Sequence, residues 1–515
     1  MEAGGIGMVL ANVTPSSINA DLHYVPTVHV DHIDGAVIRA YAQTAGATAT
    51  LTGGDFQEAE APAIAAFSSR GPALAGAGDL LKPDIMAPGV DILAAVAPPG
   101  NNGRSFDFYS GTSMSAPHIA GIAALIMQSH PDWSPMMIKS ALMTTASTET
   151  NMGNPVFGNP FVFGAGQVVP NSADDPGLVY DASWIDWLGF LCGTGQLQAL
   201  YCPDIGIDPS DLNYPSIAIG ALAGQQTVVR TVTNVGTNGT YDVSFDPPAG
   251  IDVTVSPASL TLKNGESASY EVTFKANAAV VADTWTFGSL TWSHGPHNVT
   301  SPIAIYPVAI AAPAEVAGSG IDGSLSFDIV FGYTGSYAAA PHGLVADTPT
   351  SGNIGQDPDQ TYPSADDSPI GVQKIDYPIS GAAFVRWELV IPGPDDIDLF
   401  LENSSGDIIA ASGNGGTDEL IELVLPVDDT YTLVVHGWGV PNAPLPYTLN
   451  YWEVPLASGG SLTVDGAPAS ATVGTVGTVN VSWSGLSSDT TYLGAVSHTG
   501  PSGLMGFTLV NVDTR

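Results

Sequence analysis

The sequence predicts a multidomain protein in which an α/β segment of the doubly wound kind is followed by all-β sandwich domains. The chain has 515 residues, and since domains typically hold about 100–200 residues, three or four domains are expected. Short apolar strands alternate with helical patterns up to about residue 175, which is typical of doubly wound folds. From residue 213 onward, β-branched runs separated by turn residues indicate sandwiches.

The first 54 residues predict two strands and a helix. Residues 6–11 read as a buried apolar strand, and residues 25–30 as a second strand. Because of Pro26, the second strand is expected either at the edge of a sheet or to start at this proline. A short helix is expected over residues 34–41.

Residues 110–121 carry the strongest chemical signal. Gly111 allows a sharp backbone turn and close approach of a substrate. Ser113 follows in the first turn of a predicted helix, whose apolar residues recur at helical spacing. Unpaired N–H groups at a helix start favour developing negative charge, which suits the oxyanion of acyl transfer. A plain N-cap serine is the structural alternative.

These twelve residues, Ser-Gly-Thr-Ser-Met-Ser-Ala-Pro-His-Ile-Ala-Gly, resemble the nucleophile motif of subtilisin-like serine proteases. Residues 67–72 and 82–90 resemble the family's segments before the nucleophile. Residues 211–216 and 230–236 are similar to its plant-type branch. The resemblance implies a serine endopeptidase that hydrolyses protein or peptide substrates through an acyl-enzyme on Ser113, with no required cofactor.

The resemblance also implies a domain order. It comprises the C-terminal part of a protease-associated domain (1–54), the nucleophile-bearing half of a subtilisin-like catalytic domain (55–175), a connecting segment (176–212), a fibronectin type III-like sandwich (213–310), a β linker region (311–351), a sandwich resembling the bacterial pre-peptidase C-terminal domain (352–455) and a C-terminal β region (456–515).

Only the serine of the family's catalytic set has a counterpart in this sequence. The catalytic Asp and His and the oxyanion-hole Asn should precede the protease-associated segment. His23, His29 and His32 match no such motif, and His118, five residues beyond Ser113, is expected to be structural. We therefore expect an N-terminally truncated chain that is inactive alone. The alternative is a non-catalytic secreted β-domain protein that binds polymer or a surface.

The composition excludes some partners. Eleven basic residues against 50 acidic residues give a net charge of −39, which repels nucleic acid and anionic membranes. No apolar run reaches the ~18 residues of a membrane span. We expect a secreted, extracellular monomer, an expectation based on the resemblance and the composition because no signal-peptide pattern is visible.

Three further sets of residues could form a disulfide, a metal site or an aromatic surface. Cys192 and Cys202 suggest a structural disulfide in an oxidising compartment. Asp395, Asp396 and Asp398, and the pair Asp366 and Asp367, are weak calcium candidates; the preferred interpretation is a solvated acidic loop. Trp387, Trp438 and Trp452 are expected in a sandwich core rather than on an aromatic binding face.

Overall fold

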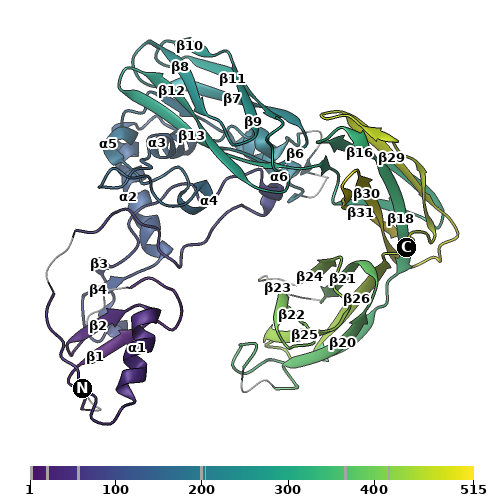
Figure 1. Cartoon of the computed structure of the whole chain (residues 1–515), viewed down its shortest axis with the longest axis horizontal. Helices are drawn as coiled ribbons and strands as arrows, with labels where there is room; N and C mark the ends of the chain where they lie inside the picture. Colours follow the sequence, from purple (N-terminus) through teal and green to yellow (C-terminus); the bar gives the residue numbers. More distant parts are fainter. Residues whose placement is uncertain are drawn as a thin grey trace. The chain divides into compact units, whose positions relative to one another are not determined.

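The computed structural model of the chain describes residues 4–18, 23–54, 58–197, 201–202, 205–364, 368–391, 393, 395–413, 415 and 418–515. The chain divides into two compact units, Met1–Val308 and Ala309–Arg515. In the described part, the α-helices belong to the first unit, and the second is built of β-sandwiches (Figure 1). Among these helices, none combines the length and hydropathy that a transmembrane span requires.

The N-terminal segment forms a small parallel sheet and one helix. Strand β1 (Met8–Ala11) pairs with β2 (Thr27–Val30), and α1 (His32–Ala42) follows. As predicted, β2 begins directly after Pro26, and the helix includes residues 34–41. The prediction of a buried strand over 6–11 was wrong: Ile6 is 91% exposed and β1 alternates between exposed and half-buried residues, because two strands and one helix cover little apolar surface.

The α/β segment between residues 58 and 175 has little sheet in its described residues. Strands β3 (Ile92–Ala95) and β4 (Phe106–Tyr109) form an antiparallel pair. Leu93, in β3, is 58% exposed. Only one edge of each strand is paired in the described sheet.

Two helices of this unit begin at the Ser113 motif and at a serine–proline pair. Ser134 caps the second of these helices by accepting a 3.0 Å hydrogen bond from Met137 N, and Pro135 is its first residue. This helix packs on the helix that begins at Thr112 through Ile126, Ile138 and Leu142. The helices are α2 (Thr112–Ser129), α3 (Pro135–Thr144), α4 (Pro160–Phe163), α5 (Pro170–Ala173) and α6 (Trp184–Gly193).

A two-sheet sandwich completes the first unit. One sheet has the order β10 (Ser259–Leu262), β8 (Gly239–Asp246), β12 (Thr286–His294), β13 (His297–Pro307) and β6 (Ile217–Leu222); the other has the order β5 (Leu178–Tyr180), β7 (Gln225–Asn234), β11 (Ser267–Ala276) and β9 (Ile251–Ser256). Trp292 and Tyr270 lie buried between them. Strand β5 comes from the predicted connecting segment, so the start of that segment belongs to the sandwich.

The second unit contains a sandwich assembled from both of its ends. Its sheets have the orders β14 (Ile310–Ala311), β16 (Gly323–Phe331), β29 (Val476–Trp483), β27 (Leu462–Gly466), and β15 (Glu315–Ser319), β31 (Gly503–Asp513), β30 (Thr491–Gly500), β18 (Ala338–Ala346); β17 (Gly335–Ser336) pairs with β28 (Ser470–Ala471). The regions 311–351 and 456–515, predicted as separate, thus form one domain, because their strands share both sheets and one core.

A further sandwich is inserted into this domain. Its sheets have the orders β19 (Thr350–Ile354), β26 (Leu445–Pro455), β21 (Ala382–Val390), β24 (Asp418–Val424), and β20 (Val372–Ile379), β25 (Asp429–Gly439), β22 (Asp396–Glu402), β23 (Ile408–Ser412). Trp387 and Trp452 are buried, as expected, but Trp438 is 43% exposed. We call this domain the inserted sandwich.

Candidate active site

Ser113 is the second residue of α2, and its side chain is exposed. The helix starts after Gly111, which has no side chain to cap it. First-turn N–H groups therefore remain available, and the helix dipole adds partial positive charge at this end. Within the described residues, no side chain hydrogen-bonds to the Ser113 hydroxyl.

Hydrogen bonds fix the turn before Ser113 to the preceding segment. Gly111 N donates to Gly89 O at 2.8 Å, and Ser115 Oγ donates to Ala87 O at 2.9 Å. On the other side of the turn, Asp91 N donates to Ser110 Oγ at 2.9 Å. A Cβ on Gly89 would lie 2.2 Å from Ser115 Oγ, so only glycine permits this approach.

The same segment is anchored at its start by a charged cluster around Asp84. Its carboxylate accepts a 2.7 Å hydrogen bond from Tyr214 and lies 2.7 Å from Lys139 Nζ, and Lys82 pairs with it as well. Burial opposes the charge, but the ammonium groups of Lys139 and Lys82 hold the pKa of Asp84 below its ordinary value. This cluster therefore holds in place the start of the segment to which the Ser113 turn is hydrogen-bonded.

A pocket of about 490 Å³ opens beside this turn. Thr112 and Ser115, which flank Ser113 in the first turn of α2, form part of its wall. Phe67, Met86 and Val162 contribute apolar surface. The nucleophile candidate therefore adjoins a cavity large enough for a side chain.

Two of the histidines named from the sequence have hydrogen-bond partners other than Ser113. His118 Nδ1 lies 2.8 Å from Met114 O, within its own helix. His29 Nε2 lies 2.9 Å from Asn12 Oδ1, next to β1. None of the described histidines hydrogen-bonds to the Ser113 hydroxyl.

The structure joins Cys192 and Cys202 by a disulfide, with a Cα–Cα distance of 5.5 Å. The bond ties the end of α6 to the segment that follows it. The pairing is the one suggested by the close spacing of the two cysteines.

The carboxylates of Asp395, Asp396 and Asp398 do not form a metal-binding group: the described residues contain no set of three or more acids, histidines or cysteines placed to hold an ion. Asp398 instead faces the ring nitrogen of His436 at 3.3 Å, and the pKa of Asp396 is raised by burial and by Asp398. We therefore do not assign calcium to these three residues. Asp366 and Asp367 lie outside the described residues.

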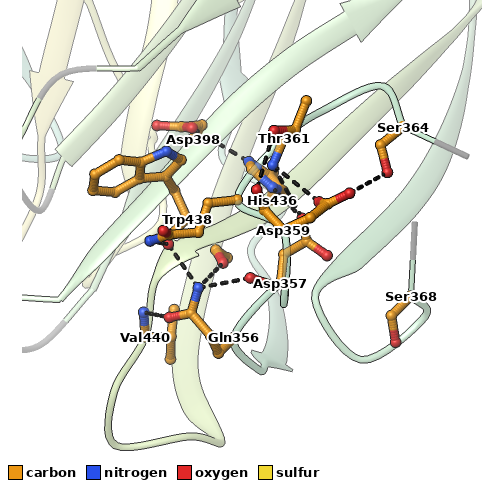
Figure 2. Close-up of polar contacts among 12 residues, drawn as sticks. Gln356, Asp357, Asp359, Thr361, Ser364, Ser368, Asp398, His436, Trp438 and Val440 are labelled. Atoms are coloured by element: carbon orange, nitrogen blue, oxygen red, sulfur yellow. Dashed lines mark hydrogen bonds and ion pairs between the residues drawn. The ribbon is translucent and has the colours of Figure 1, made fainter. Parts of the chain in front are cut away.

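Two polar residues of the inserted sandwich escaped the sequence analysis. Asp357 and His436 are both buried and lie 3.1 Å apart (Figure 2). They are 79 positions apart in the chain, and neither belongs to a motif. Only the fold brings them together.

Comparison with known proteins adds family information to this geometry. Residues 33–166 match the sequence profile of the subtilase family, and residues 211–305 match that of a fibronectin type-III domain. The subtilase match begins within the segment expected to be a protease-associated remnant.

The chain is similar to plant subtilisin-like proteases. It is 41% identical over 336 residues to subtilisin-like protease SBT1.7 of Arabidopsis thaliana, covering 59% of this chain and 44% of that protein. It is 38% identical over 352 residues to subtilisin-like protease Glyma18g48580 of Glycine max, again covering 59% and 44%. The chain thus spans less than half the length of these relatives.

Solved structures align weakly. Tripeptidyl peptidase 2 matches over 78% of this chain and 46% of its own, with 9% identity and a TM-score of 0.25. The pre-peptidase C-terminal domain of a Bacillus anthracis collagenase matches over 27% of this chain and 96% of its own, with 11% identity and a TM-score of 0.12. Scores this low support no statement about this chain.

The motif at Ser113, the profile match that contains it and the plant relatives agree. The chain carries a subtilase-family segment over residues 33–166, followed by a fibronectin type-III domain.

Proposed function

We propose that this chain supplies the nucleophile, Ser113, of a subtilisin-type serine endopeptidase. The observation that carries the proposal is the position of Ser113 at the exposed start of α2, in a turn fixed to residues 87–91. The adjoining pocket supports it, since a substrate side chain needs a cavity beside the reacting serine.

The reaction assigns Ser113 one covalent role. As a base takes its proton, Oγ attacks the carbonyl carbon of the peptide, and N–H groups at the start of α2 stabilise the oxyanion. The C–N bond then breaks and the amine leaves with the proton. Water hydrolyses the resulting ester and restores the hydroxyl. No cofactor enters these steps.

We further propose that the chain is inactive by itself. A serine hydroxyl without an adjacent base is a weak nucleophile, and no described histidine bonds to Ser113. The catalytic Asp and His and the oxyanion Asn would have to be supplied from outside this chain.

A fluorophosphonate probe tests both proposals. The chain as given should show no labelling above background, and adding a folded segment that bears the missing groups should produce labelling that Ser113→Ala abolishes. The matched control is Ser105→Ala, a serine outside the motif, which should leave that labelling unchanged. Labelling of the unassisted chain that Ser113→Ala removes would contradict the proposed inactivity, and labelling that survives Ser113→Ala would contradict the nucleophile.

We propose a secreted, monomeric protein acting on protein or peptide substrates. The Cys192–Cys202 disulfide supports an oxidising compartment. The net charge of −39 disfavours nucleic acid as a partner. Light scattering of the purified chain tests the monomer, and detection in the culture medium tests secretion.

A further inference from the structure

A buried histidine lies between two carboxylates in the inserted sandwich (Figure 2). His436 Nε2 is 3.1 Å from Asp357 Oδ2, and its Nδ1 is 3.3 Å from Asp398 Oδ2. The imidazole is 1% exposed, and Asp357 is fully buried. Neutral imidazole carries one N–H and one lone pair, so only the protonated ring can donate to both carboxylates.

The charged groups around the ring favour that protonated form. Asp359, in the same loop as Asp357, is a third acid near the ring; the hydrogen bond from Ser364, and more weakly the charge of His436, lower its pKa. On β20, Lys374 is 3.0 Å from Glu402 of β22, so its positive charge is already compensated. Asp396, on β22 beside Asp398, is a further acid. Tyr362 and Phe400 contribute neutral ring faces at 6.2 Å and 5.9 Å from the imidazole ring. On its own strand, His436 has no charged residue among the three positions on either side.

The loop that carries Asp357 lies along the end of β25. Gln356 Oε1 accepts from Val440 N at 2.7 Å, and Gln356 Nε2 donates to Trp438 O at 2.7 Å. Asp357 N donates to Gly437 O at 2.8 Å. The ion pair of Asp357 with His436 continues this series of contacts along β25, so it helps to anchor what we call the 355–364 loop.

We propose that His436 is a pH-sensitive latch that holds the 355–364 loop on strand β25 while its imidazole is protonated and releases the loop as the pH rises. Burial opposes the charge on the ring, but the hydrogen bonds and charges of Asp398 and Asp357 raise the pKa of His436 above its ordinary value. A raised folded-state pKa gives a stabilisation that is complete below the ordinary value and is lost as the pH rises through the raised one.

The two carboxylates differ in how they can respond to loss of the proton. The Asp398 side chain is 15% exposed and can be hydrated in place. Asp357 is fully buried, and its Oδ1 has no hydrogen-bond partner in the described structure. Loss of the cation beside a buried carboxylate is strongly destabilising. Thr361 N, in the same loop, still donates to Asp357 Oδ2 at 3.3 Å, but the attachment of Asp357 to β25 through His436 is weakened.

Hydrogen exchange on the full chain between pH 6 and pH 9.5 tests the latch. After correction for the intrinsic pH dependence of exchange, protection in the 355–364 loop should fall at least tenfold with a one-proton midpoint. That midpoint should equal the His436 pKa measured by NMR on histidine-labelled protein. The 403–407 turn, where Asn403 N donates to Asp407 O, should show no such step. Loop protection that is independent of pH, or that changes at a pH where His436 does not titrate, would overturn the proposal.

Two variants distinguish release of the 355–364 loop by His436 from a general destabilisation of the protein at high pH. His436→Gln should leave the loop unprotected at every pH. Asp398→Asn removes one of the two negative partners at the more exposed position and should move the midpoint to lower pH. His498→Gln, at another buried histidine of the same unit, is the control and should leave the midpoint unchanged. An Asp398→Asn midpoint equal to that of the parent chain would overturn the proposal even if His436→Gln fails to fold.

Discussion

The hydroxyl of Tyr214 donates a 2.7 Å hydrogen bond to Asp84 Oδ1 across 130 positions of sequence. Tyr214 directly precedes the fibronectin type-III strands, and Asp84 begins the segment that supports the Ser113 turn. The bond therefore connects the sandwich to the nucleophile segment within one compact unit.

Removal of the Tyr214 hydroxyl should destabilise the segment that begins at Asp84 and holds the Ser113 turn. Tyr214→Phe leaves Asp84 paired with its lysines but removes a charge-assisted bond, so we expect a loss of about 1–3 kcal/mol in the free energy of unfolding. Urea denaturation measures it. Tyr241→Phe is the matched control, since its hydroxyl reaches Asn234 only at 3.5 Å, and should cost less. An equal loss in both variants would contradict the role of the Tyr214–Asp84 bond.

Substitution of Gly89 should directly displace the turn that carries Ser113. In Gly89→Ala the new methyl would lie 2.2 Å from Ser115 Oγ and 2.9 Å from Gly111 O. Relief of these clashes requires the turn to move, which should cost about 1–3 kcal/mol and increase hydrogen exchange at residues 110–115. Gly100→Ala, where no atom lies within 4 Å of the added carbon, should change stability by less than about 0.5 kcal/mol. Unchanged exchange at residues 110–115 in Gly89→Ala would refute the prediction.

Acid should destabilise the C-terminal sandwich through His498. Thr508 Oγ1 donates to Pro313 O at 2.8 Å, so it accepts from His498 Nε2, which leaves Nδ1 to accept from Tyr337. Burial lowers the pKa of His498 to about 4. A lowered histidine pKa means that the unfolded chain binds the proton first, so stability falls as the pH drops from about 6.5 to about 4, by up to about 3 kcal/mol.

The pH dependence of urea denaturation checks this sign. In His498→Gln, the free energy of unfolding should fall less between pH 6.5 and pH 4 than in the parent chain. In His436→Gln, the fall over this pH range should be the same as in the parent chain, because the proposed loss of the proton from His436 occurs at higher pH. If the free energy of unfolding falls equally in the parent chain and in His498→Gln, His498 is not the group responsible for the destabilisation by acid.

Opening the Cys192–Cys202 bond should destabilise the end of α6. The bond closes a loop with a sequence separation of 10, so the double variant Cys192→Ser, Cys202→Ser should lose about 2–3 kcal/mol at most. Thermal denaturation with and without a reductant measures the loss. The reductant should lower the Tm of the parent chain and leave that of the double variant unchanged; equal Tm values for the oxidised parent and the variant would show that the bond contributes nothing.

Local interactions made several elements predictable from the sequence. Pro26 sets the start of β2, and Ser134 with Pro135 sets the start of α3, because each acts through its own backbone or the next turn. The motif around Ser113 likewise contains its own glycine turn and helix start. In the sequence, the two cysteines that form the disulfide are also close together.

Long-range pairing decided the remaining features. Strand β5 joins β7 of the sandwich, β15 pairs with β31 from the far end of the chain, and Asp357 meets His436. The β-branched runs indicate strands but not their partners, since strand partners depend on which apolar faces pack together. The sequence by itself therefore determined the family of the nucleophile segment and the local element starts. Only the tertiary structure decided which strands share a core and which buried charges face each other, because both depend on contacts between residues distant in the chain.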